Sequence, residues 1–149
     1  MKFLLTKELG RLAKWLRILG YDAEYCDNSN HSVLIIRALR DDRVILTRNQ
    51  HLPRHTGIPI ILVNAQELKQ QIGEVVKTLK LEVNKDIIFT RCILCNTLLV
   101  PIDKVKVQDK VPEYVFATQD NFITCPKCNR VYWQGTHWGN VAKMIEEIT

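Results

Sequence analysis

Residues 43–49 read RVILTRN, and this stretch indicates the fold class of the chain. Its apolar run, Val44 to Leu46, contains no polar position. A continuous run of this kind is expected of a parallel strand that is buried on both faces. The run ends in Thr47, Arg48 and Asn49. Such a stretch predicts polar side chains at the carboxyl edge of a parallel sheet, where α/β proteins bind their ligands.

The segments around this strand alternate between strand and helix patterns. Strand patterns cover residues 2–6 (KFLLT), 21–26 (YDAEYC) and 58–63 (IPIILV). Apolar residues recur at helical spacing from Leu9 to Leu19, and Gly20 is placed to end that helix. Further helices are expected over residues 33–41 and 64–82, the latter capped by Asn64. The alternation predicts an α/β fold, with a small parallel sheet and helices on both faces.

The residue pattern of the sequence changes near residue 85. Two cysteine pairs follow, with short pieces of strand character between them, LLVPI (98–102) and PEYVFA (112–117). The chain has 149 residues, which suffices for two small modules. We therefore predict an α/β domain over residues 1–85 and a cysteine module over residues 86–149 that ends in a short helix.

Composition and charge narrow the functional classes. No apolar run approaches the ~20 residues of a membrane span, and the start, MKFLLTKELG, has too short an apolar run for a signal peptide. A cytoplasmic protein without a membrane association is expected. The net charge is +5, and residues 1–63 hold ten Lys and Arg against six Asp and Glu. A basic first module favours a polyanionic partner, although mildly basic chains are often simply soluble.

Four of the five cysteines form two C-x-x-C pairs, Cys92/Cys95 and Cys125/Cys128. Two such turns supply four thiolates, enough for a tetrahedral zinc site with no open position for a catalytic water. Asn96 and Asn129 follow the pairs, and Asn tolerates the left-handed backbone that these turns often need. The sequence therefore predicts a structural zinc ribbon, with an extended hairpin in the 29-residue gap between the pairs. Zinc would contribute on the order of 10 kcal/mol to its folding.

Basic and aromatic residues lie close to these cysteines. Arg91, Lys127 and Arg130 flank the pairs, and Tyr132, Trp133 and Trp138 follow. Such a mixture can bind single-stranded nucleic acid by charge and stacking. The aromatic residues can equally form the core of a small ribbon, and the sequence leaves both interpretations open.

The order of motifs resembles a known family. The stretches LGRLAKWLRILGYDAEY, VILTRN, FTRCILCN, VPEYVFAT and CPKCNRVYWQGTHW together resemble the PIN-like RNase domain family named after the C-terminal domain of the Mut-seven exoribonuclease. The resemblance runs from Phe3 to about Trp138. It implies a PIN-like α/β domain followed by a zinc ribbon, an RNA substrate, and phosphodiester cleavage by magnesium or manganese held on carboxylates.

The resemblance also implies three acidic positions that this chain lacks. The family's first strand usually ends in Asp, acids usually precede the second helix, and the third strand usually ends LTRD. The matching positions here are Thr6, one of Asn30 or His31, and Asn49. Losses at all three places predict that metal-dependent cleavage is weak or absent. The cations near these positions, Lys7, Arg11, Arg48 and Arg54, are then candidate RNA contacts, unless they make ordinary surface ion pairs.

Two other functions stay open at this point. The chain could be an active ribonuclease that uses magnesium or manganese on a relocated acid set around Glu8, Asp27 and Asp41 or Asp42, with Glu8 as the best rescue candidate. It could also be a protein-interaction module that kept the fold and lost RNA, with a partner bound through the zinc ribbon. The leading hypothesis is a ribonuclease-family protein with a structural zinc, RNA binding, and little nuclease activity.

Overall fold

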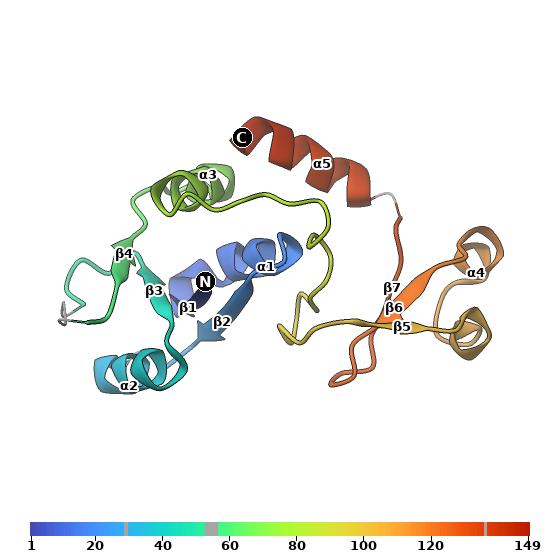
Figure 1. Ribbon diagram of the computed structural model, residues 1–149, viewed down its shortest axis with the longest axis horizontal. Coiled ribbons are helices and arrows are strands. Elements are labelled where there is room, and N and C mark those ends of the chain that lie inside the picture. The colour runs from blue at the N-terminus through green and yellow to red at the C-terminus, as the bar shows by residue number, and fades with distance from the viewer. Residues whose placement is uncertain (29, 53–56, 136) are drawn as a thin grey trace.

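The computed structural model describes residues 1–28, 30–52, 57–135 and 137–149 (Figure 1). Within these residues the elements follow the alternation expected from the sequence, and a smaller sheet comes after it. In chain order they are β1 (Lys2–Thr6), the 3-10 turn η1 (Lys7–Leu9), α1 (Gly10–Ile18), β2 (Asp22–Cys26), α2 (His31–Asp41), β3 (Val44–Thr47), β4 (Ile60–Leu62), α3 (Leu68–Thr78), β5 (Val100–Ile102), the 3-10 turn η2 (Lys104–Val107), α4 (Glu113–Thr118), β6 (Phe122–Thr124), β7 (Val131–Tyr132) and α5 (His137–Ile148).

The first sheet is parallel, with the described strands in the order β2-β1-β3-β4. Its register pairs Thr6 with Cys26, and Thr47 with Leu62. Because all these strands run the same way, Thr6 and Thr47 lie at one edge of the sheet, the carboxyl edge. The predicted α/β class is confirmed.

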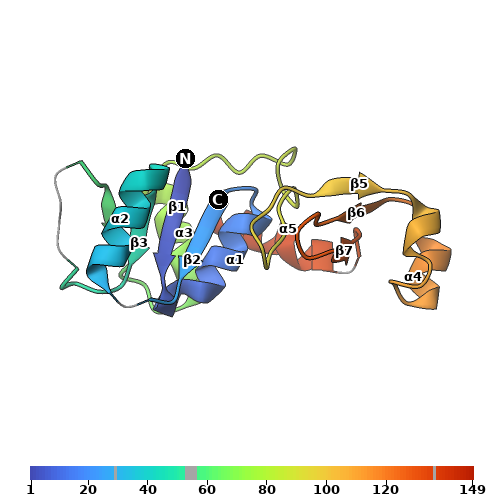
Figure 2. The same cartoon turned by 90° about the horizontal axis from the view of Figure 1, so that it is seen from below.

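Both faces of this sheet are covered by helices (Figure 2). Phe3, Leu5 and Leu46 pack with α1 and α3 in one cluster, whereas Leu4 and Ile45 pack with α2 in the other. Successive residues of a strand point to opposite faces. A strand buried on both faces must therefore be apolar at every position, which explains the uninterrupted run at 44–46. The sheet cannot lose either helix layer without exposing that run.

The second sheet is antiparallel and small, with β5 paired to β6 and β6 paired to β7. The LLVPI stretch contributes β5, as expected, but the strand character assigned to PEYVFA is wrong, because residues 113–118 form α4. Pro112 precedes this helix with φ of −57°, and Val115 and Phe116 turn inward together onto Phe122. One helical turn brings these neighbouring apolar residues to the same side, which a strand would not.

The last helix returns to the first module. α5 lies beside α3 (Figure 1), and Ile148 belongs to the same buried cluster as Phe3 and Leu5. Lys69 on α3 and Glu147 on α5 add an exposed ion pair at 2.8 Å. Residues 137–148 therefore complete the core of the α/β module, although they follow the cysteines in sequence. The boundary proposed at residue 85 stays a prediction.

The helix cap predicted at Asn64 is wrong, because α3 begins later, with Glu67 at its N-cap. Asn64 instead donates its backbone N–H to the Glu74 carboxylate, at 3.0 Å, so Glu74 fixes the loop before the helix.

Among the described residues, no helix has the length and apolarity that crossing a bilayer requires.

Gly20 allows the two modules to meet closely. It ends α1 with φ of +94°, and a Cβ there would lie 2.3 Å from the carbonyl oxygen of Ile87, at the start of the cysteine module. Next to it, Phe89 donates its N–H to the Ile18 carbonyl at 2.9 Å. Glycine is therefore required at position 20 both by its backbone conformation and by the space available.

We predict that Gly20→Ala destabilises the protein by about 3 kcal/mol, because a strained backbone and a steric clash add together. Chemical denaturation followed by circular dichroism measures this. Gly73→Ala is the matched control, since a Cβ on this α3 residue meets nothing within 4 Å. The control is expected to stabilise α3 by up to about 1 kcal/mol. Equal stabilities for the two variants would contradict the close approach at Gly20.

Candidate metal centre and strand-edge site

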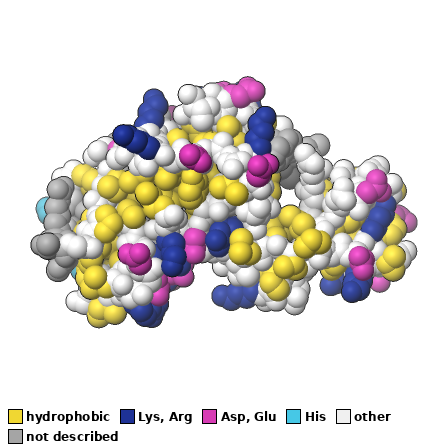
Figure 3. Space-filling model, viewed as in Figure 1, with side chains coloured by type: hydrophobic (Ala, Val, Ile, Leu, Met, Phe, Trp, Pro, Cys, Tyr) yellow, Lys and Arg dark blue, Asp and Glu magenta, His cyan; other side chains and the backbone are white. Residues whose placement is uncertain are grey.

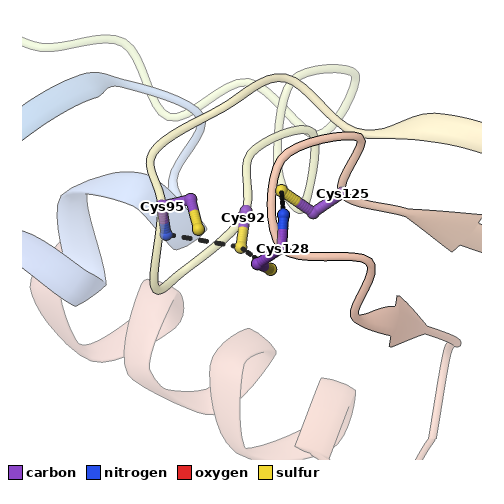
Figure 4. Close-up of side chains that lie close together, drawn as sticks. All are labelled: Cys92, Cys95, Cys125 and Cys128. Carbon is purple, nitrogen blue, oxygen red and sulfur yellow. Dashed lines mark hydrogen bonds between the residues drawn. The ribbon is translucent and has the colours of Figure 1, made fainter.

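The structure brings the four paired cysteines together. The sulfurs of Cys92, Cys95, Cys125 and Cys128 all lie within 4.8 Å of one another, and Figure 4 shows them converging from two turns. Within the described residues, this is the one group of three or more His, Cys, Asp or Glu side chains placed to hold an ion. Four thiolate donors at this spacing can surround a single metal ion.

Each turn is fixed by its own backbone. Asn96 and Asn129 have φ of 66° and 62°, in the left-handed region, as the sequence suggested for these positions. Their N–H groups return to the Cys92 and Cys125 carbonyls at 2.9 and 2.8 Å. The N–H of Cys95 points at the Cys92 sulfur, at 3.4 Å, and the N–H of Cys128 points at the Cys125 sulfur, at 3.5 Å. Donors aimed at sulfur stabilise the thiolate form that a metal requires.

The ionisation of each cysteine sulfur depends on its burial and on the groups beside it. Burial raises the pKa of Cys92, but the Tyr132 hydroxyl at 3.1 Å and nearby backbone N–H groups lower it to about 7. Burial and, after it, the neighbouring sulfurs of Cys128 and Cys92 together raise the pKa of Cys95 to about 12. Thiolates this close repel one another, so full ionisation requires a cation between them. The donor set thus fits a soft divalent metal.

Arg17 ties this centre to the α/β module. Its Nη1 donates to the carbonyls of Ile93 and Leu94, at 2.8 and 3.3 Å, inside the first cysteine turn. Its Nε donates to the Ala23 carbonyl in β2, at 2.7 Å. Burial lowers the pKa of Arg17, and the Cys92 and Cys95 thiolates raise it again. A four-thiolate site with a divalent ion has net negative charge, and this buried cation offsets part of it.

Asn96 makes a second connection to the same module. Its side-chain oxygen accepts the Ala23 N–H at 3.0 Å, and its Nδ2 donates to the Asp22 carboxylate at 2.6 Å. Arg43 donates to that same carboxylate at 2.7 Å, and also to the Phe3 carbonyl. The chain of contacts therefore runs from the cysteine turn through Asp22 to the central strand β1. Sequence reasoning missed this junction and Arg17, although Arg17 follows Ala13 by four positions, on the edge of the apolar stripe.

At the carboxyl edge of the sheet, the three positions expected to be acidic do lie together. The hydroxyls of Thr6 and Thr47 are 3.1 Å apart, and Thr47 accepts the Asn49 N–H at 3.0 Å. The Asn49 side-chain nitrogen lies 3.4 Å from His31 Nε2, at the start of α2. Asn49 Oδ1 accepts the His51 N–H, which turns the amide nitrogen toward His31. Thr6, His31 and Asn49 thus form one connected set through Thr47, and none of the four is a carboxylate.

Glu8 is the carboxylate that contacts Thr6 and Thr47 at this edge. Its Oε1 accepts from the Thr6 hydroxyl at 2.5 Å, from the Arg48 N–H at 2.9 Å and from the Thr47 hydroxyl at 3.3 Å. Burial acts to raise the pKa of Glu8, but these hydrogen bonds together hold it below its ordinary value. Glu8 therefore joins the ends of β1 and β3.

The other acids proposed as a relocated set do not join Glu8. Asp27 follows β2 at the same edge and is exposed. Asp41 and Asp42 end α2 and precede β3, at the opposite edge of the sheet, where Lys2 Nζ donates to the Asp41 carbonyl. The length of a five-residue strand, about 13 Å, separates the two edges. The structure thus offers no convergence of Glu8 with Asp41 or Asp42.

The predicted RNA-contacting cations lie around the carboxyl edge where they can be described. Lys7 and Arg11 are exposed on η1 and α1, and Arg48 is exposed after β3. None of these three has a carboxylate oxygen within 4 Å among the described residues. Arg54 lies outside the described residues. Beside Arg48, a pocket of about 250 Å³ is lined by uncharged side chains, including Thr47, Asn49 and Gln50.

The chain is thus a two-part protein, in which a parallel α/β module is joined through a buried arginine to a module whose four cysteines could hold a metal ion. A family model covers both parts. The model described as Mut7-C RNAse domain matches residues 1–145, and the chain belongs to that family. No curated protein and no solved structure matches the chain.

We predict that Glu8→Gln lowers stability at neutral pH by at most about 1 kcal/mol, because the ionised carboxylate accepts its hydrogen bonds more strongly than an amide does. The folded pKa of Glu8 lies below its ordinary value of 4.5, so this stabilisation is present above that value and is lost as pH falls through the folded pKa. Melting temperatures of both proteins from neutral to acidic pH measure the difference.

The melting curves should therefore diverge at neutral pH and converge in acid. Glu146→Gln, a change at an exposed residue of α5, is the control for loss of one negative charge. If Glu8→Gln and Glu146→Gln gave the same pH profile, the bonds at Glu8 would contribute nothing to stability.

Proposed function

We propose that this protein binds single-stranded RNA at the carboxyl edge of its parallel sheet, with metal-dependent nuclease activity weak or absent. The observation that carries the proposal is the hydrogen-bonded set Thr6, Thr47, Asn49 and His31 at the edge where the family's chemistry requires acids. Membership of a ribonuclease family supports RNA as the ligand.

The chemistry of the edge supports weak cleavage. Magnesium and manganese prefer several oxygen ligands, usually including more than one carboxylate. At this edge Glu8 already accepts three hydrogen bonds through one oxygen, and the set beside it contains no carboxylate. Amides and hydroxyls are poor substitutes, because they bring no charge to offset the dehydration of the ion. Water activation by a hard cation therefore has little support here.

The same changes favour binding without a metal. An acidic cluster repels phosphate unless an ion covers it, whereas a set without carboxylates leaves nearby cations available. Arg48 and Arg11 flank the edge from a strand end and a helix, without a close carboxylate among the described residues. Burial acts to raise the pKa of Glu74, but hydrogen bonds from Asn64 and Ala65, and the charge of Arg48 after them, hold it below its ordinary value. Arg48 remains exposed and able to reach a phosphate.

The ion at the cysteine centre is proposed to be zinc, in a structural role. Four thiolates match the donor set of closed zinc sites, in which no position is left for a reacting water. The ion would hold the two turns together, and with them the turn that Arg17 and Asn96 join to the α/β module.

We predict one zinc per chain by elemental analysis, with zinc–sulfur distances of about 2.3 Å by X-ray absorption. Cys95→Ser should lose the ion and lower the melting temperature, because on the order of 10 kcal/mol of binding energy supports the module. Cys26→Ala is the control, since this fifth cysteine lies in β2 and not in the cluster. Purified native protein without zinc, or Cys95→Ser with full zinc content, would contradict the site.

We predict that native protein binds single-stranded RNA but does not cleave it in manganese. Arg48→Gln should weaken binding about fivefold at ~0.1 M salt and reduce the salt slope by about 0.7, as expected for one lost phosphate contact. Fluorescence anisotropy at several salt concentrations measures both. Arg40→Gln removes the same charge near the opposite edge and should change affinity little. Rapid cleavage that a chelator abolishes would show an active nuclease.

A triple variant tests whether carboxylates added at the carboxyl edge give it metal binding and weaken its RNA binding. Thr6→Asp, His31→Asp and Asn49→Asp together restore carboxylates at three positions that the structure connects. Manganese binding by calorimetry should appear, and metal-free RNA affinity should fall because three negative charges now face the phosphates. The native protein under the same conditions is the reference. Unchanged manganese and RNA affinities would place the RNA site elsewhere.

A further inference from the structure

A groove of about 520 Å³ lies beside the metal centre, on the cysteine module. The first cysteine turn forms one wall with Ile93 and Leu94, and β7 with Trp133 after it forms the floor. Lys110 and Arg130 line it from two further segments. Its volume is within the range of sites that hold a small ligand or part of a larger one. We refer to it as the ribbon groove.

The charged residues that line the ribbon groove are all basic. Among the described residues that line it none is acidic, while Lys110 and Arg130 are both exposed and have no carboxylate within 4 Å. Arg130 directly precedes β7, whose residues also line the groove. Figure 3 shows Lys and Arg side chains together with Asp and Glu side chains at this end of the molecule, so the absence of acids is a property of the groove lining.

The two aromatic rings that line the ribbon groove are held in place by contacts with residues of the protein interior. Tyr132 places its hydroxyl 3.1 Å from the Cys92 sulfur, and Trp133 packs edge-on against Phe122 with ring centroids 6.5 Å apart. Both rings are half-buried and still line the groove. Leu94 is 44% exposed and adds an apolar wall. Fixed aromatic and apolar surfaces next to free cations suit a ligand that has flat rings and phosphates.

We propose that the ribbon groove binds a nucleotide of single-stranded RNA, with the base against Tyr132, Trp133 and Leu94 and the adjoining phosphates at Lys110 and Arg130. This second RNA site rests on the proposed RNA binding of the protein, and it is separate from the carboxyl edge. The two interpretations of the aromatic residues, core and nucleic-acid contact, then both apply: the inner edges pack and the outer faces bind.

The wall of the ribbon groove is connected to the α/β module. Arg17 holds the carbonyls of Ile93 and Leu94, and it belongs to the same helix as Arg11. The two arginines are six residues apart, or about 9 Å along the helix axis. Near its start, α1 thus carries Arg11, a cation of the carboxyl edge. Near its end, it carries Arg17, which holds the wall of the groove. The geometry of the ribbon groove is fixed relative to the first RNA site.

The experiment compares two double variants of the full-length, zinc-loaded protein. Lys110→Gln with Arg130→Gln removes both groove cations, and Lys85→Gln with Lys106→Gln removes the same charge from exposed positions outside the lining. The probe is a labelled oligouridylate of about ten nucleotides. Unchanged zinc content and melting temperature establish that each variant folds. The groove double is expected to weaken binding on the order of 10-fold at ~0.1 M salt and to lower the salt slope by about 1.4.

The control double should stay within about twofold of native affinity. Equal losses in the two doubles would mean diffuse attraction and would overturn the proposal. Unchanged RNA affinity in the groove double would also overturn it, and would leave the groove to a protein ligand. A photoreactive uridine in the probe should cross-link to the peptide that contains Tyr132 and Trp133, and cross-links confined to the carboxyl edge would count against the groove.

These outcomes separate the two RNA sites. Loss of binding in Arg48→Gln alone supports the carboxyl edge and rejects the groove. Loss in the groove double alone supports the groove and rejects the edge. No binding of the probe by native protein rejects both.

Discussion

The guanidinium of Arg17 is the contact on which the arrangement of the whole molecule depends. It is 7% exposed, and it donates to β2 on one side and to the first cysteine turn on the other. A buried cation is costly unless all its surroundings accept hydrogen bonds or carry opposite charge. Three carbonyls and the nearby thiolates meet that requirement. The cysteine turn is therefore needed to solvate Arg17, and Arg17 is needed to orient the turn.

This mutual dependence makes the two modules one connected scaffold. The first cysteine turn is held to α1 and β2 through Arg17 and Asn96. At the carboxyl edge, hydrogen bonds to Glu8 join the ends of the strands β1 and β3. Under the proposals made above, an ion at the cysteines would fix the first turn without contacting a substrate, and the exposed cations of the carboxyl edge would bind RNA.

Much of the fold follows from local pattern. The run at 44–46, the stripe from Leu9 to Leu19 and the C-x-x-C pairs depend on periodicity and spacing, which a sequence displays directly. The convergence of Thr6, His31 and Asn49 was expected from the resemblance to the family, since parallel strands end at one edge. Residues 113–118 misled because Tyr, Val and Phe favour strands in general, whereas Pro112 and a buried Phe122 selected a helical turn here. The partners of Arg17 and Asp22 are distant in sequence, so their pairing appears only in three dimensions.

The position of Ile148 has a consequence for synthesis of the chain. Its side chain closes the cluster that contains Phe3, although the two residues stand near opposite ends of the sequence. A ribosome makes the strands, the first helix and the cysteine turns before it makes this residue. The nascent α/β module must therefore wait with part of its apolar surface exposed to water, or to a chaperone, until residue 148 has left the exit tunnel. Vectorial synthesis thus makes the last helix the final step in closing the first core.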